Sequence, residues 1–423
     1  MKYIVIILSA FFAVPVFAQQ TFIQCGRLID GKSNTVQTEM TIIVESNKII
    51  DVRKGYQSGS ANDKLINMRN LTVMPGFIDS HVHLSSETSK NKYMENFTLN
   101  DEDYALKAVK YAERTLMAGF TTVRDLGGLV AVSLRNAINA GDIKGPRILA
   151  AGKSIATTGG HADPTNGYSR AIIGDPEAKD GVVNSPEEAR KAVRQRYKES
   201  SDVIKITATG GVLSNAKDGA GAQFTEDEIK AVVSTAKDYG YRVAAHAHGA
   251  EGMKRAIRAG VSSIEHGTFM DDEAIALMKE HGTYYVPTIT AGKSVADSAK
   301  IPGYYPPLVV PKAIATGPKI QSTFAKAYKS GVKIAFGTDA GVFTHGKNYK
   351  EFEYMIEVGM PAMEAIKSAT MNAADLLGIA ERTGSIEKGK SADIIAVNGD
   401  PLKDIKVLSL MNFVMKEGVV YKQ

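Results

Sequence analysis

Two histidines separated by one residue, His81 and His83, lie in the apolar stretch GFIDSHVHL, residues 76–84. Side chains alternate between the two faces of an extended strand, so these two imidazoles point to the same side. His246 and His248 have the same spacing in RVAAHAHG, residues 242–249. Because imidazole nitrogens are common ligands of divalent metal ions, each pair can contribute to a metal site.

Three more polar residues lie near the ends of apolar stretches: Lys205 in SDVIKITATGG, His266 in SSIEHGT and Asp339 in VKIAFGTDAG. Zn²⁺ accepts histidine and aspartate ligands and leaves positions open for water and substrate. We therefore predict a site for two divalent metal ions, with zinc as the expected metal, although Mn²⁺, Co²⁺ and Fe²⁺ accept the same ligands. The expected ligands are His81, His83, Lys205, His246, His266 and Asp339.

Lys205 is the unusual member of this set. A protonated ammonium would repel two cations, so a lysine at this position is expected to be modified. Carboxylation of its amine by CO₂ would give a carbamate, whose two oxygens can bridge a pair of metal ions. The alternative is an unmodified lysine whose side chain extends from an apolar strand to water.

Eight apolar, strand-like stretches recur along the middle of the chain, and helical patterns separate several of them. They cover residues 76–84, 121–128, 146–155, 201–211, 242–249, 262–268, 283–290 and 332–341. Helices are predicted at 225–239, with a capping box between Thr225 and Glu228, and at 250–259. This order predicts an α/β fold, a (β/α)₈ TIM barrel, whose carboxyl strand ends share one mouth. A doubly wound open sheet is the competing fold, but it does not explain polar residues at nearly every strand end.

The two chain ends are rich in short strands and turns. Residues 19–74 and 385–423 are predicted to pair into a small β-sandwich domain, with the barrel domain spanning residues 75–384. Residues 1–18 combine Lys2, an apolar run from Ile4 to Phe17 and the small residue Ala18. This pattern is typical of a secretory signal peptide and predicts a secreted protein. The expected compartment is a bacterial periplasm.

The composition excludes several classes of protein. Of the 423 residues, 44% are hydrophobic and 23% charged, and the net charge of +5 comes from dispersed residues, so no nucleic-acid partner is expected. Cys25 is the one cysteine, so no intramolecular disulfide can form. No stretch after the signal peptide reads as a membrane helix, and stable membrane insertion is not expected. The sequence neither predicts nor excludes the formation of a homo-oligomer.

The motifs taken together resemble those of the amidohydrolase superfamily. PGFIDSHVHL, the lysine of VIKI, AHAHG, IEHGT and GTDAG are similar to its strand-one HxH, strand-four lysine, strand-five and strand-six histidines and strand-eight aspartate. GSIEKGKSADIIAVNGDPLKDI is similar to the family's return to its sandwich domain. With TTGGHADP and ATGGVLS, the chain looks most like the imidazolonepropionase-related branch, which contains prolidase-like and Xaa-Arg-type dipeptidases and ochratoxin-type amide hydrolases.

This resemblance implies a role for each ligand. His81, His83 and Asp339 would hold a buried metal ion, His246 and His266 would hold an outer one, and carboxylated Lys205 would bridge them. A metal-bridging hydroxide would attack the scissile carbonyl, and Asp339 would take its proton and pass it to the departing nitrogen.

Three histidines are candidate substrate ligands. His248 is expected to hydrogen-bond the developing oxyanion or a substrate carboxylate, the alternative being a purely structural histidine. His161 lies in the glycine-rich loop TTGGHADP and His345 in AGVFTHGKN, and loops that follow barrel strands form the pocket. Either could instead be an ordinary loop residue.

The favoured function is hydrolysis of an amide bond in a dipeptide, of the Xaa-Pro or Xaa-Arg/Lys type, or in an N-acyl amino acid. Lys205 favours this hypothesis because it implies a bridged metal pair. The alternatives are a deaminase or cyclic amidohydrolase acting on a heterocycle, and a catalytically inactive barrel that binds a small molecule.

Overall fold

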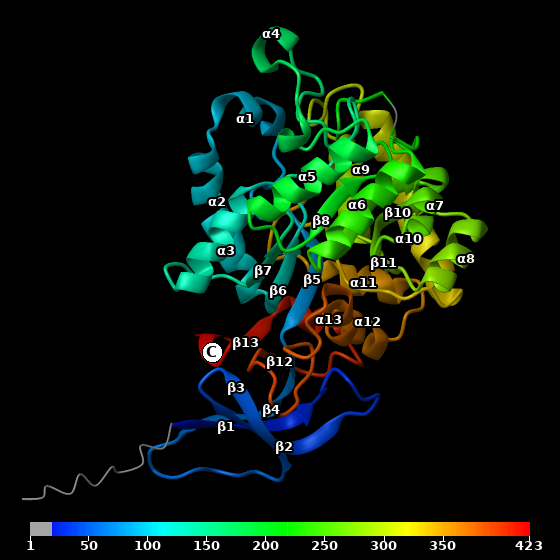
Figure 1. Ribbon diagram of the computed structural model, residues 1–423. Helices are drawn as coiled ribbons and strands as arrows, with labels where there is room; N and C mark the ends of the chain where they lie inside the picture. Colours follow the sequence, from blue (N-terminus) through cyan, green and yellow to red (C-terminus); the bar gives the residue numbers. More distant parts are fainter. Residues whose placement is uncertain (1–18, 218) are drawn as a thin grey trace, which may run out of the picture.

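The computed structural model describes residues 19–217 and 219–423, so the predicted signal peptide lies outside the described residues. Strands from both chain ends lie together in the lower part of the view, and parallel strands surrounded by helices lie above them (Figure 1). None of the helices in the described part of the chain combines the length and the apolar character that a membrane crossing needs.

In the described residues, strands from the two chain ends form one seven-stranded sheet in the order β14-β13-β12-β4-β1-β2-β3. The strands are β1 (Gln20–Leu28), β2 (Gln37–Glu45), β3 (Lys48–Lys54), β4 (Lys64–Pro75), β12 (Ile394–Asn398), β13 (Met411–Lys416) and β14 (Val419–Lys422). β4 pairs with β1 on one side and with β12 on the other, which joins the two ends of the chain. The predicted β-sandwich is therefore not confirmed, because these strands form a single sheet.

The middle of the chain contributes two parallel sheets in the described residues, ordered β5-β6-β7 and β11-β10-β9-β8. The strands are β5 (Phe77–Val82), β6 (Phe120–Asp125), β7 (Arg147–Ala150), β8 (Ile204–Thr207), β9 (Val243–Gly249), β10 (Ser263–Phe269) and β11 (Tyr284–Val286). Almost every residue in these strands is buried, as expected where helices cover a parallel sheet. The predicted α/β class is confirmed.

The eighth predicted strand, residues 332–341, is not a regular strand. Single parallel bridges connect it to its neighbours, Ile334 to Tyr285 of β11 and Ala340 to Val82 of β5. A further parallel bridge joins Ile155, after β7, to Ile206 of β8. Asp339 has a positive φ of 60°, which interrupts extended backbone geometry, so the barrel predicted from the sequence is seen as two parallel sheets linked by isolated bridges.

Helices pack around the parallel strands. The α-helices are α1 (Lys92–Thr98), α2 (Asp101–Met117), α3 (Val130–Ala140), α4 (Arg170–Ile173), α5 (Pro186–Lys198), α6 (Glu226–Asp238), α7 (Ala250–Arg258), α8 (Asp272–His281), α9 (Ile289–Ala299), α10 (Val310–Lys329), α11 (Lys350–Glu357), α12 (Ala362–Ser368) and α13 (Met371–Leu377), and the 3₁₀ helices are η1 (Ala178–Asp180) and η2 (Ile405–Ser409). α6 and α7 match the two helices predicted from the sequence. The Thr225 amide donates to Glu228 Oε2 over 2.9 Å, which confirms the predicted capping interaction.

Candidate metal centre and its cavity

One cavity collects all of the predicted site residues except His345. Its lining includes His81, His83, His161, Lys205, His246, His248, His266 and Asp339. These side chains come from several parallel strands and the segments next to them: His81 and His83 from β5 and the residue after it, Lys205 from β8, His246 and His248 from β9, His266 from β10, and Asp339 from the segment that bridges β11 and β5. A site built in this way needs the tertiary fold, because no single segment contributes more than two of these side chains.

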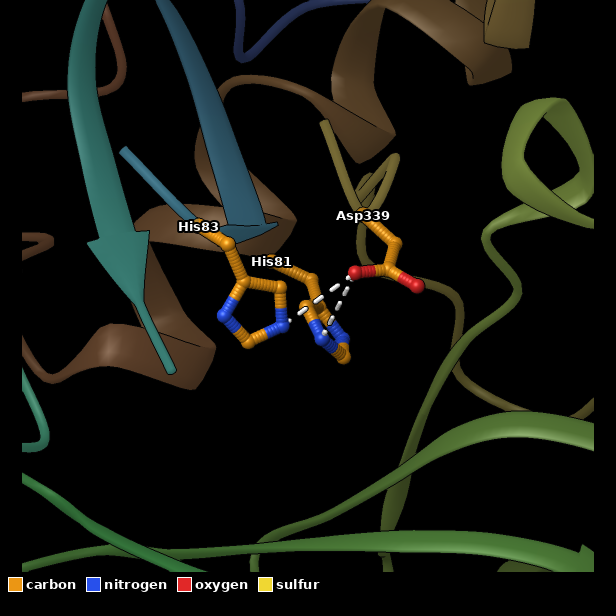
Figure 2. A group of neighbouring side chains, drawn as sticks. All are labelled: His81, His83 and Asp339. Carbon is orange, nitrogen blue, oxygen red and sulfur yellow. Dashed lines mark ion pairs between the residues drawn. The ribbon is translucent and has the colours of Figure 1, made fainter. Parts of the chain in front are cut away.

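His81, His83 and Asp339 form the tightest group in this cavity (Figure 2). Asp339 Oδ1 lies 3.2 Å from His83 Nε2 and 3.5 Å from His81 Nε2. Within the described residues, His81 Nε2 and Asp339 Oδ1 are buried without a hydrogen-bond partner. Since buried polar atoms normally have a partner, two orphaned acceptor atoms facing a third nitrogen fit a divalent cation.

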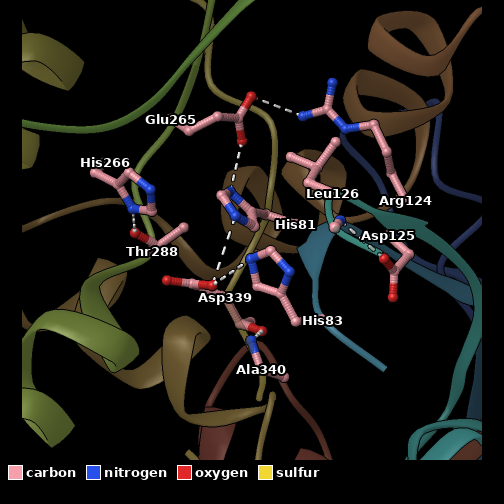
Figure 3. A network of polar contacts seen from close by, with 12 residues as sticks. His81, His83, Arg124, Asp125, Leu126, Glu265, His266, Thr288, Asp339 and Ala340 are labelled. Carbon is pink, nitrogen blue, oxygen red and sulfur yellow. Dashed lines mark hydrogen bonds and ion pairs between the residues drawn. The ribbon is translucent and has the colours of Figure 1, made fainter. Parts of the chain in front are cut away.

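Glu265 of β10 orients His81 (Figure 3). Burial raises the pKa of Glu265, but the charge of Arg124 and the hydrogen bond from His81 outweigh it and lower this pKa to about 2. Burial, together with the charge of Lys205, lowers the pKa of His81 to about 4, so its ring is neutral at pH 7. Nδ1 of His81 therefore donates to Glu265 Oε2 over 2.9 Å, and Nε2 presents its lone pair to the cavity.

Glu265 was not identified from the sequence, although Arg124 and Asp125 lie in the apolar stretch 121–128. The structure pairs Arg124 with Glu265 over 2.8 Å, whereas Asp125 accepts from the backbone amides of Leu84 and Gly127. The sequence feature that could have revealed this pair is a charged residue inside each of two apolar stretches. A buried carboxylate and a buried guanidinium each need a partner of opposite charge.

Replacing Glu265 with glutamine should weaken metal binding at His81. If the NH₂ group of the introduced amide faces Nδ1, the imidazole must carry its proton on Nε2, which removes the lone pair aimed at the cavity. We expect the affinity for a divalent metal to fall by about 10- to 100-fold, as measured by competition with a chromogenic chelator. Ser263→Ala removes a different hydrogen bond to Glu265 and is the matched control. Wild-type affinity in Glu265→Gln would contradict the role given to Glu265.

The ring of His266 lies close to the rings of both His81 and His246. The ring centroids of His246 and His266 are 4.6 Å apart, and those of His81 and His266 are 5.0 Å apart. His246 Nε2 donates to the Gly210 carbonyl over 3.1 Å, which leaves Nδ1 with a lone pair. Burial lowers the pKa of both His246 and His266 well below the usual value, so both rings are neutral at pH 7.

Backbone strain is concentrated at this site. His266, Thr288 and Asp339 all have a positive φ, of 71°, 53° and 60°, although none of them is glycine. The Thr288 hydroxyl lies 2.8 Å from His266 Nδ1, so two of the strained residues contact each other directly. Strained backbone of this kind persists only where the surrounding structure enforces it, and it is common at functional sites.

Lys205 extends from β8 into the same cavity and is only 4% exposed. Burial lowers the pKa of its amine to about 8, against the attraction of Glu265 and Asp339. A larger share of this amine is thus neutral near pH 7 than for an ordinary lysine. The neutral amine is the form that reacts with CO₂.

The three candidate substrate ligands have different positions. The rings of His161 and His246 stack with centroids 4.3 Å apart, and His248 Nδ1 lies 2.8 Å from the Thr268 hydroxyl. Both His161 and His248 line the cavity. His345 is not among the residues that line the cavity: its side chain is buried, Nε2 donates to the Ser86 carbonyl over 2.9 Å, and its ring stacks on Tyr111.

Comparisons with known proteins agree with this geometry. The model of the amidohydrolase family matches residues 72–422. The ochratoxinase of Aspergillus niger is 32% identical over 442 aligned residues, which cover 96% of this chain and 87% of that protein. Among solved structures, a Xaa-Pro dipeptidase with methionine bound in its active site is 56% identical, with a TM-score of 0.94 and coverage of 96% of this chain and 100% of that one. A prolidase complexed with N-methylphosphonate-L-proline is 32% identical, with a TM-score of 0.88 and the same coverage.

Proposed function

This chain belongs to the amidohydrolase family, and on this premise we propose that it hydrolyses the amide bond of a dipeptide or an N-acyl amino acid. It is a metal-dependent hydrolase acting on carbon–nitrogen bonds. The observation that carries the proposal is the group of His81, His83 and Asp339, with two orphaned acceptor atoms at the base of a cavity. Relatives that are a prolidase and an ochratoxinase favour this reaction over attack on a heterocycle.

We propose that the cavity binds two metal ions through the ligand set predicted from the sequence. Zinc is the expected metal. His81, His83 and Asp339 would hold one ion, and His246 and His266 would hold the other. Bound there, the ions would lower the pKa of a bound water to about 7 and polarise the scissile carbonyl.

Carboxylation of Lys205 is part of this proposal. The neutral amine attacks the carbon of CO₂, a nitrogen–carbon bond forms, and one N–H proton leaves to water, giving a carbamate anion. The lowered pKa of Lys205 and its place in the cavity beside Asp339 support this step. The carbamate removes a positive charge from a site that must hold two cations.

The remaining steps belong to the side chains of this chain. Asp339 would hold a metal ion through Oδ1, and its second carboxylate oxygen would accept the proton of the attacking water and return it to the leaving nitrogen. His248 lines the cavity and is positioned by Thr268, and its other nitrogen can donate to the developing oxyanion. His161 lies beside His246, where it can contact the substrate.

Two further proposals concern the whole chain. The ring of parallel pairing from β5 through β11 and back through residues 332–341 is proposed to be the (β/α)₈ barrel of the family. The composition of residues 1–18 supports export and cleavage after Ala18, which would place the mature enzyme outside the cytoplasm.

The function is tested by an assay of released amine. Xaa-Pro, Xaa-Arg and N-acyl amino acid substrates should be cleaved, and dialysis against a chelator should abolish this cleavage until a divalent metal is restored. Release of ammonia from a heterocycle with no cleavage of any amide in the panel would contradict the proposal.

A further inference from the structure

One wall of the cavity is apolar. α9 and α10 contribute Ala291, Val295 and Ile320 to the lining, and loops contribute Val212, Leu213 and Val342. These side chains line the same cavity as the metal-ligand candidates. A substrate bound for cleavage would therefore place part of itself against aliphatic side chains.

The charged side chains that line the cavity are Lys205 and Asp339, and both belong to the ligand set. Among the described lining residues, no carboxylate remains to pair with a cation held against the apolar wall. Lys312, on α10, directs its ammonium to the carbonyls of Gly211, Ser214 and Ala216. A substrate ammonium or guanidinium at this wall would thus be desolvated without a counter-charge from the described lining residues, which is costly.

Close helix packing keeps the wall in place. A Cβ at Gly292 of α9 would lie 2.8 Å from Ile320 Cγ2, and a Cβ at Gly317 of α10 would lie 2.3 Å from Ala296 Cβ. The two helices therefore touch through their glycines, and Ile320 cannot move back to admit a longer side chain.

The loop side of the wall is also fixed. The Tyr93 hydroxyl donates to the Leu213 carbonyl over 2.8 Å, and Lys312 Nζ donates to the Ser214 carbonyl over 2.8 Å. These bonds anchor the backbone at Leu213 and at the residue that follows it, and the Leu213 side chain is half-buried in the cavity lining.

We infer that the substrate side chain seated on this wall is apolar and uncharged, so that the enzyme acts on residues such as leucine, methionine or phenylalanine and discriminates against lysine and arginine. This inference rests on the proposed amide hydrolysis and narrows its substrate class. Leu213 and Ile320 are the specificity-determining residues, because they supply the aliphatic surface where a basic side chain would need an acid.

The test compares kcat/KM across two dipeptide series that differ in one residue, leucine, glutamine or lysine, on the amino side or on the carboxyl side of the bond. In one of the series, leucine should exceed lysine by about 10²-fold, because the penalty for a mismatched buried polar group is larger than that for a missing methylene. Glutamine controls for polarity without charge and should fall between them. Equal values for leucine and lysine in both series would overturn the inference while leaving amide hydrolysis intact.

A charge placed on the wall should reverse the preference. Leu213→Glu should improve the lysine-to-leucine ratio of kcat/KM by about tenfold or more, since a counter-charge relieves the buried cation. Leu213→Gln is the matched control of equal size and should leave lysine disfavoured. An unchanged ratio in Leu213→Glu would contradict the assignment.

Calorimetric titration of the metal-loaded enzyme with L-leucine and with L-lysine separates the inference from the proposed function. Tighter binding of leucine with no cleavage of any dipeptide would support the preference of the wall for apolar side chains and refute the proposed amide hydrolysis. Tighter binding of lysine would overturn the inference.

Discussion

Asp339→Asn should lower kcat by about 10³-fold, the range that general acid–base catalysis contributes. Its Oδ1 faces His81 and His83, where it would hold the metal ion, and the second oxygen of the carboxylate is the proposed proton acceptor for the attacking water. Asparagine keeps an oxygen ligand but accepts no proton at neutral pH. It also tolerates the positive φ of 60° at this position, so the fold should persist.

The measurement is kcat for the best amide substrate, together with metal content and circular dichroism. Asp202→Asn is the matched control, because Asp202 precedes β8 at the amino end of the strands and pairs with Arg135. We expect the control to keep its activity. Full turnover in Asp339→Asn would contradict the proton-transfer role.

Lys205→Ala should lower kcat/KM by roughly 10²-fold or more. Polarisation of the scissile carbonyl by correctly held metal ions lowers the activation free energy by several kcal/mol, and the variant should lose part of this effect. Acetate or propionate supplied together with the metal should restore part of the activity. The cavity left by the side chain admits a short carboxylate, which can replace the carbamate as an anionic ligand. Rescue should depend on both the acid and the metal.

Lys333→Ala removes a lysine from the start of the segment before Asp339, where its ammonium lies over the Tyr284 ring. This control should be fully active and should not respond to added acid. A Lys205→Ala enzyme with wild-type kcat/KM would show that no bridge is needed at this position.

The sequence predicted the ligand set because the relevant pattern is local. A histidine pair with a spacing of two, a lysine inside VIKI and an aspartate after AFGT each mark the end of an apolar stretch, and parallel strands bring such ends together. The structure places these residues in one cavity. The Thr225 and Glu228 capping pair was predictable for the same reason, since both partners lie within one helical turn.

Features that depend on contacts between distant segments were not predictable in this way. Glu265 is next to His266 in the chain, but its role comes from His81 and Arg124, which belong to other strands. His345 follows the eighth stretch, yet its ring packs on Tyr111 and its Nε2 donates to the Ser86 carbonyl, contacts with segments that are distant in the chain. The pairing of β4 with both β1 and β12, which makes one sheet from the chain ends, is likewise a long-range choice.

The most direct test of the central claim is the number of metal ions per chain in enzyme purified without chelators, measured by elemental analysis on samples that cleave an amide substrate. Two ions per chain in active enzyme is the predicted result, since His81, His83 and Asp339 are proposed to hold one ion and His246 and His266 the other. A single ion per chain in fully active enzyme would contradict the bridged pair and remove the role proposed for Lys205.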